Sequence, residues 1–459
     1  MSETWDVVVI GAGPAGLAAA TLLAEQQARV LLLDEQSEPG GQIYRGIERA
    51  SAQLAALGDD YAYGASLVAR FRASAATYRS GSVVWQVTPQ CEVWLSDAGR
   101  SHLVHARVVI LATGAMERPV PLPGWTLPGV MTAGALQIML KSSGMLPDEP
   151  FVVVGSGPLP HLLVQQCLAA GARPTAVLDT ASRDNTWRAL RHLPGALRGE
   201  GRRYLAKGLA MLATLRRSGV PRHAGVSDVR IEGDDAVTGV AFRSRGRAHR
   251  IAARLVALHE GVIPAQQLPR SIGCDFTWDA VQRCFAPVID EWGASSIANV
   301  LIAGDAGGIG GARAAEHAGG LAALEALRRI GRIDVVQRDA LAAPHRRARA
   351  AHLAVRRFLD VLYAPRAEIL TPPDDTLVCR CEEIKAGDVR AVVAQGCLGP
   401  NQAKAFLRAG MGPCQGRLCG PVVTELIAAT RGVDPADVGY YRIRPPLKPI
   451  TVGELVDAE

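Results

Sequence analysis

Apolar runs and glycine turns alternate along the first part of the chain in a regular order. Residues 6–10 (Asp-Val-Val-Val-Ile) predict a buried parallel strand, and residues 14–26 predict a helix rich in alanine and leucine. Residues 29–33 predict a second strand that ends at Asp34 and Glu35. A glycine turn joins the first strand to the helix, so these elements predict a dinucleotide-binding unit.

The same order returns in the middle of the chain. Residues 151–154 predict a strand, a glycine turn follows, and a helix runs through Cys167 to Ala170. Residues 175–178 predict the next strand, which ends at Asp179. A further apolar run at 299–305 ends in Gly304-Asp305 and resembles the first unit again. The pattern therefore predicts an α/β fold with two Rossmann-like domains, the second inserted into the first.

The domain boundaries follow from these repeats and from proline-rich punctuation. We expect the first dinucleotide-binding domain at 1–120 and 285–330, and the second at 121–284. An arginine-rich helical linker is expected at 331–373, ending at Pro372-Pro373. A small, mainly helical cysteine domain should occupy 374–435, and a proline-rich tail 436–459.

The first glycine turn has the residues that a nucleotide pyrophosphate requires. Gly11 permits a tight turn, Gly13 lets the backbone approach the phosphates, and Gly16 lets the helix pack closely on the strand. Pro14 and Ala15 open the helix, whose free N–H groups attract phosphate. The ribose hydroxyls should be bound by Asp34, with Glu35 as the competing candidate.

The second turn departs from this pattern. Gly155 and Gly157 are present, but Pro160 stands where the third glycine is expected. Asp179 favours a nucleotide with a free 2′-hydroxyl group. Three interpretations stay open at this site, namely NAD as a hydride donor, an adenine nucleotide held structurally, and no nucleotide.

Five of the nine cysteines fall in the last 81 residues, which indicates a metal site rather than a disulfide framework. Cys379-x-Cys381 and Cys414-x4-Cys419 suit the four thiolates of a [2Fe–2S] cluster. Structural zinc and plain core cysteines are the alternatives. Cys397 is the spare, and core positions are expected for Cys91, Cys167, Cys274 and Cys284. The chain has no Cys-x-x-Cys, which excludes a disulfide-reductase mechanism of the thioredoxin reductase kind.

Composition and charge narrow the classes of partner and the location that we expect. The chain is 48% hydrophobic and 20% charged, which is typical of a globular protein, and its net charge of +6 is mostly arginine. The arginines at 188–203 and 346–357 favour a solvated helix face, with a subunit contact or a membrane surface as alternatives. No stacking aromatics lie between them, so a nucleic acid partner is not expected. The sequence shows no export signal and no transmembrane segment, so we expect a cytoplasmic protein, with peripheral membrane association as the alternative.

Several segments resemble those of known flavoproteins. Gly40-Gly41-Gln42 resembles the loop beside the flavin ring in thioredoxin-reductase-like and glutathione-reductase-like proteins. Ala112-Thr113-Gly114 resembles their second signature, and Gly304-Asp305 their third. The resemblance implies FAD on the first domain. No acid–base pair or nucleophile stands out beside these segments, so no catalytic residue is assigned.

The C-terminal domain resembles the bacterioferritin-associated-ferredoxin-like [2Fe–2S] fold. With the segment from Gly40 to Arg45 and with Met116–Pro119, it makes the chain similar to the α-type flavoprotein subunit of dye-linked amine dehydrogenases. That family includes opine oxidases, D-hydroxyproline dehydrogenase and hydrogen cyanide synthase. The resemblance implies a partner β subunit of the D-amino-acid-oxidase type, which oxidises the amine. Electrons would then pass through flavin and cluster. Further candidates are an interfacial FMN and a small ferredoxin-like subunit. A self-sufficient NADH:acceptor oxidoreductase is the alternative function.

Overall fold

The first domain builds one mainly parallel sheet from two separate stretches of the chain. In the computed structural model, which describes residues 3–49 and 57–456, β1 (Glu3–Ile10) lies between β2 (Val30–Asp34) and β6 (Arg100–Leu111). β19 (Val300–Ile302) pairs with the C-terminal end of β6, so the chain returns to the first sheet after a long insertion. The complete order is β3-β2-β1-β6-β5-β4, with β3 at Thr77–Ser80, β4 at Val83–Val87 and β5 at Glu92–Asp97.

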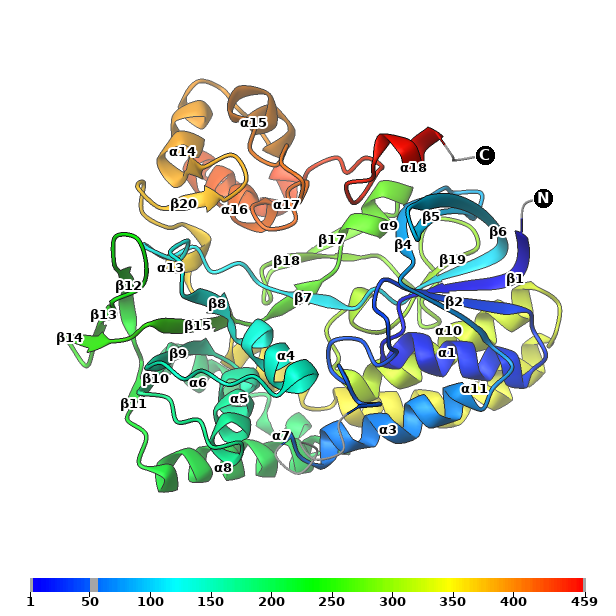
Figure 1. Ribbon diagram of the computed structural model, residues 1–459, viewed down its shortest axis with the longest axis horizontal. Coiled ribbons are helices and arrows are strands. Elements are labelled where there is room, and N and C mark those ends of the chain that lie inside the picture. Colours follow the sequence, from blue (N-terminus) through cyan, green and yellow to red (C-terminus); the bar gives the residue numbers. More distant parts are fainter. Residues whose placement is uncertain (1–2, 50–56, 457–459) are drawn as a thin grey trace.

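Four helices cover the lower side of this sheet in Figure 1: α1 (Pro14–Glu25), α3 (Asp59–Arg72), α10 (Ala312–Arg329) and α11 (Val335–Leu353). α1 and α10 pack unusually closely, because small residues line both. A Cβ atom on Gly319 of α10 would stand 2.0 Å from the carbonyl oxygen of Ala15. This close packing fixes where the first turn of α1 points.

The inserted domain has its own parallel sheet in the order β11-β10-β9-β15-β8. Its strands are β8 (Val130–Thr132), β9 (Phe151–Ser156), β10 (Ala176–Asp179), β11 (Arg222–Ala224) and β15 (Leu255–Glu260). Its helices are α4 (Ala133–Ser143), α5 (Pro158–Ala169), α6 (Arg183–Leu190), α7 (Leu193–Ala196) and α8 (Gly201–Ser218). A small sheet of β12 (Ser227–Glu232), β13 (Gly239–Ser244) and β14 (Arg247–Ala252) extends from one end.

Two short strands join the domains. β7 (Ala115–Glu117) leaves the first sheet and pairs with β16 (Val262–Pro264), which returns from the second. After α9 (Gln267–Ile272), a hairpin of β17 (Phe276–Asp279) and β18 (Cys284–Pro287) forms the platform on which the C-terminal domain lies (Figure 1).

The C-terminal domain packs on that platform through aromatic side chains. Phe285 and Tyr440 meet edge to face at 6.0 Å between ring centroids, and the Arg270 guanidinium lies 4.4 Å from the Tyr440 ring. Burial lowers the pKa of Arg270 to about 10. A second tie is the ion pair between Arg283 and Glu425, whose carboxylate is almost fully buried.

The linker and the small domain complete the described chain. The linker helices are α11, α12 (Arg356–Leu362) and α13 (Ala367–Leu370). The small domain contains β20 (Leu377–Cys379), β21 (Ile384–Lys385), α14 (Ala386–Ala394), α15 (Pro400–Leu407), α16 (Gly420–Arg431) and α17 (Pro435–Val438). The tail ends in α18 (Val452–Val456) and donates a hydrogen bond from Leu447 N to Trp85 O, 2.8 Å, at the edge of the first sheet.

Across residues 3–49 and 57–456, no helix combines the length and the apolar character needed to cross a membrane.

Candidate flavin and iron–sulfur sites

The first glycine turn is shaped to receive a phosphate group. A Cβ atom on Gly16 would collide with the carbonyl oxygen of Gly11 at 1.8 Å, so this glycine serves the packing of helix on strand. A Cβ atom on Gly13 would meet only the Cα atom of Gly41, at 4.0 Å. Gly13 therefore leaves free space above the N-terminus of α1, where the pyrophosphate of a dinucleotide belongs.

Of the two candidate ribose acids, only Asp34 lies against this turn. Its Oδ2 accepts a hydrogen bond from Ala12 N at 2.6 Å, and its Oδ1 accepts one from Gln36 N at 2.8 Å. Glu35 is exposed and forms an ion pair with Lys448 of the tail. The geometry therefore favours Asp34 as the ribose-binding carboxylate.

The other predicted flavin-binding residues gather around the same turn. Gly40 N donates to Ala12 O at 2.8 Å, which lays the loop of Gly41 and Gln42 over the glycine turn. Arg45 donates to Gln36 and Gln42, but its Nε atom is buried without a hydrogen-bond partner.

The second and third signatures end beside this loop. Thr113, between Ala112 and Gly114, has a buried hydroxyl with no partner. Asp305 follows Gly304, and its Oδ1 accepts hydrogen bonds from Gly310 N (2.8 Å) and Gly311 N (2.9 Å) at the start of α10. Unpartnered buried donors next to open glycine backbone fit an anionic dinucleotide such as FAD.

A buried lysine that the sequence analysis did not single out lies behind the flavin loop. Lys141 of α4 is only 4% exposed, and its Nζ atom donates to Ile43 O at 3.0 Å and to Gln137 Oε1 at 2.8 Å. Gln137 in turn donates to Gln166 of α5 at 2.8 Å. The second domain thus holds the flavin loop of the first through one buried cation. The sequence did carry a signal for this buried lysine, because Lys141 ends the mostly apolar run Ala-Leu-Gln-Ile-Met-Leu-Lys.

Burial lowers the pKa of Lys141 to about 7, and the positive charge of Arg45 adds to this. In the unfolded chain the lysine keeps this proton up to pH ~10.4. Between about pH 7 and that pH, the folded protein therefore binds fewer protons than the unfolded chain. Folding stability contributed by this residue therefore rises as the pH increases from about 7 to about 10. In Lys141→Met this rise, on the order of 5 kcal/mol at most, should vanish.

The measurement is the difference in unfolding temperature between the wild-type chain and Lys141→Met across that pH interval. Lys207→Met, which removes a lysine on the more exposed surface of α8, is the matched control. If the difference in unfolding temperature between the wild-type chain and Lys141→Met stays constant with pH, the lowered pKa of Lys141 is contradicted.

The second glycine turn also has the architecture of a nucleotide site. Gly155 and Gly157 lie between β9 and α5, and Asp179 ends β10. Asp179 is almost fully buried and paired with Arg222 of the neighbouring strand. His161, in the first turn of α5, has a buried Nδ1 atom without a partner. Burial lowers the pKa of His161, although the nearby Asp179 opposes this effect.

A histidine–glutamate pair borders this second turn. His259 Nδ1 lies 2.7 Å from Glu117 Oε1, and a Cβ atom on Gly157 would stand 3.7 Å from the His259 ring. Glu117 Oε2 also accepts a hydrogen bond from Gly134 N at 3.0 Å, at the start of α4. The two residues come from β7 and β15, far apart in the sequence, so no local pattern could have predicted their contact.

The linker closes over the carboxyl end of the second sheet. Glu260, at the end of β15, is 1% exposed and accepts two hydrogen bonds from the Arg366 guanidinium, at 2.9 and 2.7 Å. Thr180 donates to the same carboxylate at 2.9 Å. Burial, together with the charge of Asp179, raises the pKa of Tyr363 to about 12. Residues 363–366 therefore lie across the strand ends where a dinucleotide would extend.

The four predicted cluster ligands lie together as two pairs. The thiol of Cys379 contacts that of Cys419, and Cys381 contacts Cys414. Within the described part of the chain, no three His, Cys, Asp or Glu side chains are placed around one point as a single metal ion requires. A [2Fe–2S] cluster takes two thiolates on each iron, so two pairs fit it better than a tetrahedral zinc site.

Backbone N–H groups point at the sulfur of Cys379, which belongs to the buried pair Cys379 and Cys419. The Cys419 thiol and the N–H groups of Gly410 and Glu382 lower the pKa of Cys379 to about 5. The neighbouring Cys379 sulfur and burial raise the pKa of Cys419, whose sulfur lies 3.9 Å from the Tyr441 hydroxyl. A Cβ atom on Gly412 would stand 2.1 Å from the Cys381 Cβ, so this loop has room only for glycine.

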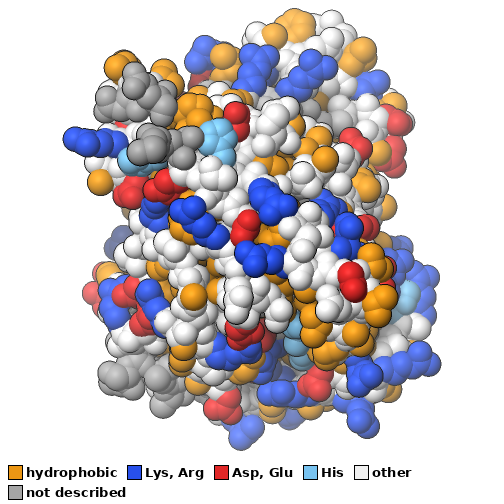
Figure 2. Space-filling model, turned by 90° about the vertical axis from the view of Figure 1, so that its right-hand side faces the viewer, with side chains coloured by type: hydrophobic (Ala, Val, Ile, Leu, Met, Phe, Trp, Pro, Cys, Tyr) orange, Lys and Arg blue, Asp and Glu red, His pale blue; other side chains and the backbone are white. Residues whose placement is uncertain are grey.

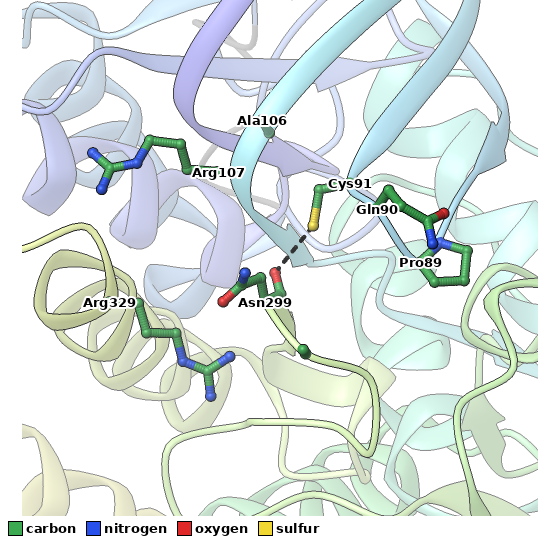
Figure 3. Close-up of a pocket in the computed structure, with 8 residues that line it drawn as sticks. Pro89, Gln90, Cys91, Ala106, Arg107, Asn299 and Arg329 are labelled. Carbon is green, nitrogen blue, oxygen red and sulfur yellow. Dashed lines mark hydrogen bonds between the residues drawn. The ribbon is translucent and has the colours of Figure 1, made fainter.

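The cysteines expected in the core are buried. Cys91, Cys167, Cys274, Cys284 and Cys397 are all at most 7% exposed. Cys91 borders an open pocket with Arg107, Asn299 and Arg329 (Figure 3). Asn299 precedes β19, so this pocket lies at the amino end of the parallel strands, whereas nucleotides bind at the carboxyl end. Both arginines are also engaged, with Ile330 O and with Glu325.

Comparison with protein families matches both halves of this arrangement. Residues 5–319 match the family described as pyridine nucleotide-disulphide oxidoreductase, and residues 377–429 match the BFD-like [2Fe-2S] binding domain. The fold resembles that of L-proline dehydrogenase from P. horikoshii, with a TM-score of 0.72 at 19% identity over 99% of this chain and 80% of that one. These matches define a flavin- and iron–sulfur-dependent oxidoreductase.

Relatives of known name narrow the class. The A subunit of opine oxidase from Rhizobium meliloti (strain 1021) is 51% identical, over 99% of this chain and 98% of its own length. The HcnB subunit of hydrogen cyanide synthase from Pseudomonas aeruginosa is 35% identical, over 96% of each chain. The alpha subunit of sarcosine oxidase from Rhizobium meliloti is 27% identical, and the match spans 42% of that longer protein. The chain belongs to the family that contains the opine oxidase A subunit, as well as HcnB, which confirms the resemblance noted in the sequence.

Proposed function

We propose that this chain is the electron-transfer subunit of a hetero-oligomeric amine dehydrogenase, acting on an opine or a D-hydroxyproline-type amino acid. A β subunit of the D-amino-acid-oxidase type would oxidise the amine on its own flavin. The electrons would then pass through the FAD and the cluster of this chain to an acceptor. Bound FAD supplies two-electron and one-electron chemistry, which lets it connect a hydride donor with a one-electron cluster.

The contact between the linker and the end of β15 is the observation that favours this proposal over an NADH oxidoreductase. A nicotinamide must extend from the second glycine turn towards the flavin, past the end of β15. That strand end carries Glu260, which Arg366 of the linker holds. The unpartnered His161 still suits a short adenine nucleotide bound beside Asp179. We therefore propose that any nucleotide there is structural and donates no hydride.

The chain's own residues then have positioning roles. Asp34 and the N-terminus of α1 bind the nucleotide half of FAD, and Arg45 and Thr113 offer donors to it. Lys141 orients the loop of Gln42 and Ile43 from behind. The substrate amine would be bound by the partner, which agrees with the lack of an assigned acid–base pair beside these residues.

An anaerobic visible spectrum of the purified chain, recorded before and after adding NADH, tests the proposal. We expect the flavin band near ~450 nm to remain, while dithionite bleaches it and so proves that the flavin is reducible. Adding the co-expressed partner and its amine should then bleach both flavin and cluster. Bleaching by NADH alone would instead establish the NADH:acceptor oxidoreductase, and a flavin that no donor reduces would indicate a purely structural role.

A further inference from the structure

The two sulfur pairs differ sharply in their exposure. Cys379 and Cys419 are each 1% exposed and lie in the continuous core that includes Tyr440 and Tyr441. Cys381 is exposed, and Cys414 is half-buried. A cluster on these four sulfurs would therefore have one iron inside the domain and one at its surface. Electrons can leave a cluster most directly at such an exposed edge.

The segments around that edge carry four basic side chains, which we call the cluster rim: Lys404, Arg408, Arg417 and Arg444. Arg417 lies between Cys414 and Cys419 in the sequence, and its N–H donates to Cys414 O at 3.0 Å. The Lys404 Nζ atom lies 5.0 Å from the centroid of the Tyr441 ring, whose hydroxyl is 3.9 Å from the Cys419 sulfur. Only two acidic residues, Glu382 and Glu383, stand beside Cys381 in the sequence, and Glu382 is paired with Arg408.

Apolar side chains complete this surface. Phe406 is 54% exposed and Met411 is 49% exposed, and Met411 directly precedes the glycine that packs on Cys381. Along the top of the face in Figure 2, the level of the small domain in Figure 1, Lys and Arg side chains lie among hydrophobic ones. A small apolar patch within a ring of one charge is typical of transient redox contacts, in which charge steers the partners together.

We propose that the cluster rim is the docking surface for an acidic one-electron carrier protein. This rests on the relay function proposed above and identifies where the electrons leave. Each encounter passes one electron from the reduced cluster to the oxidised carrier, so two encounters follow each two-electron oxidation. The carrier must be acidic because the four side chains of the cluster rim are all basic. It must also accept single electrons, which a lipid surface cannot do.

The test uses the full chain with its flavin and cluster, and an acidic plant-type ferredoxin as the probe. We expect binding at low ionic strength that weakens at least tenfold between about 20 and about 300 mM salt. Arg417→Glu with Arg444→Glu should also weaken binding at least tenfold, while the cluster absorbance is retained. A basic cytochrome c should bind the wild-type chain less tightly than ferredoxin does. It should bind the rim variant more tightly than ferredoxin does.

The matched control reverses two exposed arginines in and beside α6, Arg188→Glu with Arg191→Glu, which lie in another arginine-rich region. This variant should bind ferredoxin like the wild-type chain. Equal weakening in the control, or no weakening in the rim variant, would overturn the proposal. So would binding of vesicles of anionic lipid that the rim variant loses, if ferredoxin does not bind. None of these results depends on whether amine oxidation reduces the flavin, so failure of the docking surface is distinguishable from failure of the relay.

Discussion

Replacing Cys414 with serine is expected to abolish the cluster absorbance while the chain keeps its full complement of FAD. Cys414 is paired with Cys381, and in a cluster held by the four sulfurs this pair would supply both protein ligands of one iron. The side chain is half-buried and lies in a loop, so the substitution leaves the core of the small domain intact. The first glycine turn lies in another domain, and its FAD should be unaffected.

Iron and sulfide analysis, with the visible spectrum, measures this effect. Cys397→Ser provides a matched control, because it makes the same chemical change at a buried cysteine that contacts Gly399 O rather than another thiol. The control should retain iron and sulfide in full. Stoichiometric iron in Cys414→Ser would refute the ligand assignment, and loss of iron in both variants would point to general unfolding of the domain.

Replacing Gly13 with valine is expected to give a folded chain that purifies without FAD. A Cβ atom at this position meets nothing closer than 4.0 Å, and Gly13 has a φ of −77°, which any residue can adopt. The protein itself therefore tolerates the side chain. The branched methyl groups would instead occupy the space for the pyrophosphate, so the loss falls on the ligand.

The flavin content of the purified chain and its circular dichroism together decide the outcome. Gly208→Val on α8 is the control, because that glycine also has open space around it and lies far from either glycine turn in the sequence. A Gly13→Val chain with one FAD per molecule would show that the first turn does not bind the pyrophosphate. A chain that has lost its helical signal would instead show that Gly13 serves the fold.

The sequence predicted the elements that repeat with a local period. Strands at 6–10 and 151–154 appear as β1 and β9, and the return near 299 appears as β19. β19 ends at Ile302, earlier than the apolar run, because Gly304–Ala306 turns into a short 3-10 helix. In the small domain, α15 ends at Leu407, because Arg408 adopts a left-handed conformation with φ of 61°.

What the sequence could not predict depends on contacts between distant residues. His259 and Glu117 meet only because β15 and β7 lie at the junction of the two domains. Arg366 reaches Glu260 only after the linker has crossed the second sheet. In each case the two partners come from different elements, so neither hydrophobic period nor motif spacing could indicate the pair. The spacing of the four cysteines, by contrast, predicted a shared site but not which sulfur pairs with which. The predicted domain boundaries and the roles of the site residues stay predictions, for which the substitutions above are the tests.

The burial of Cys379 and Cys419 has a consequence for biogenesis. Both sulfurs lie inside the core behind Tyr440 and Tyr441, which belong to the start of the tail. Iron must therefore reach them before that last segment closes, or while it is displaced. Translation produces Tyr440 and Tyr441 after all four cysteines, so cluster delivery competes with the docking of this segment. In a cell short of iron, the flavin domains can mature while the small domain closes empty, and under the relay proposed above such a protein would accept electrons and not pass them on.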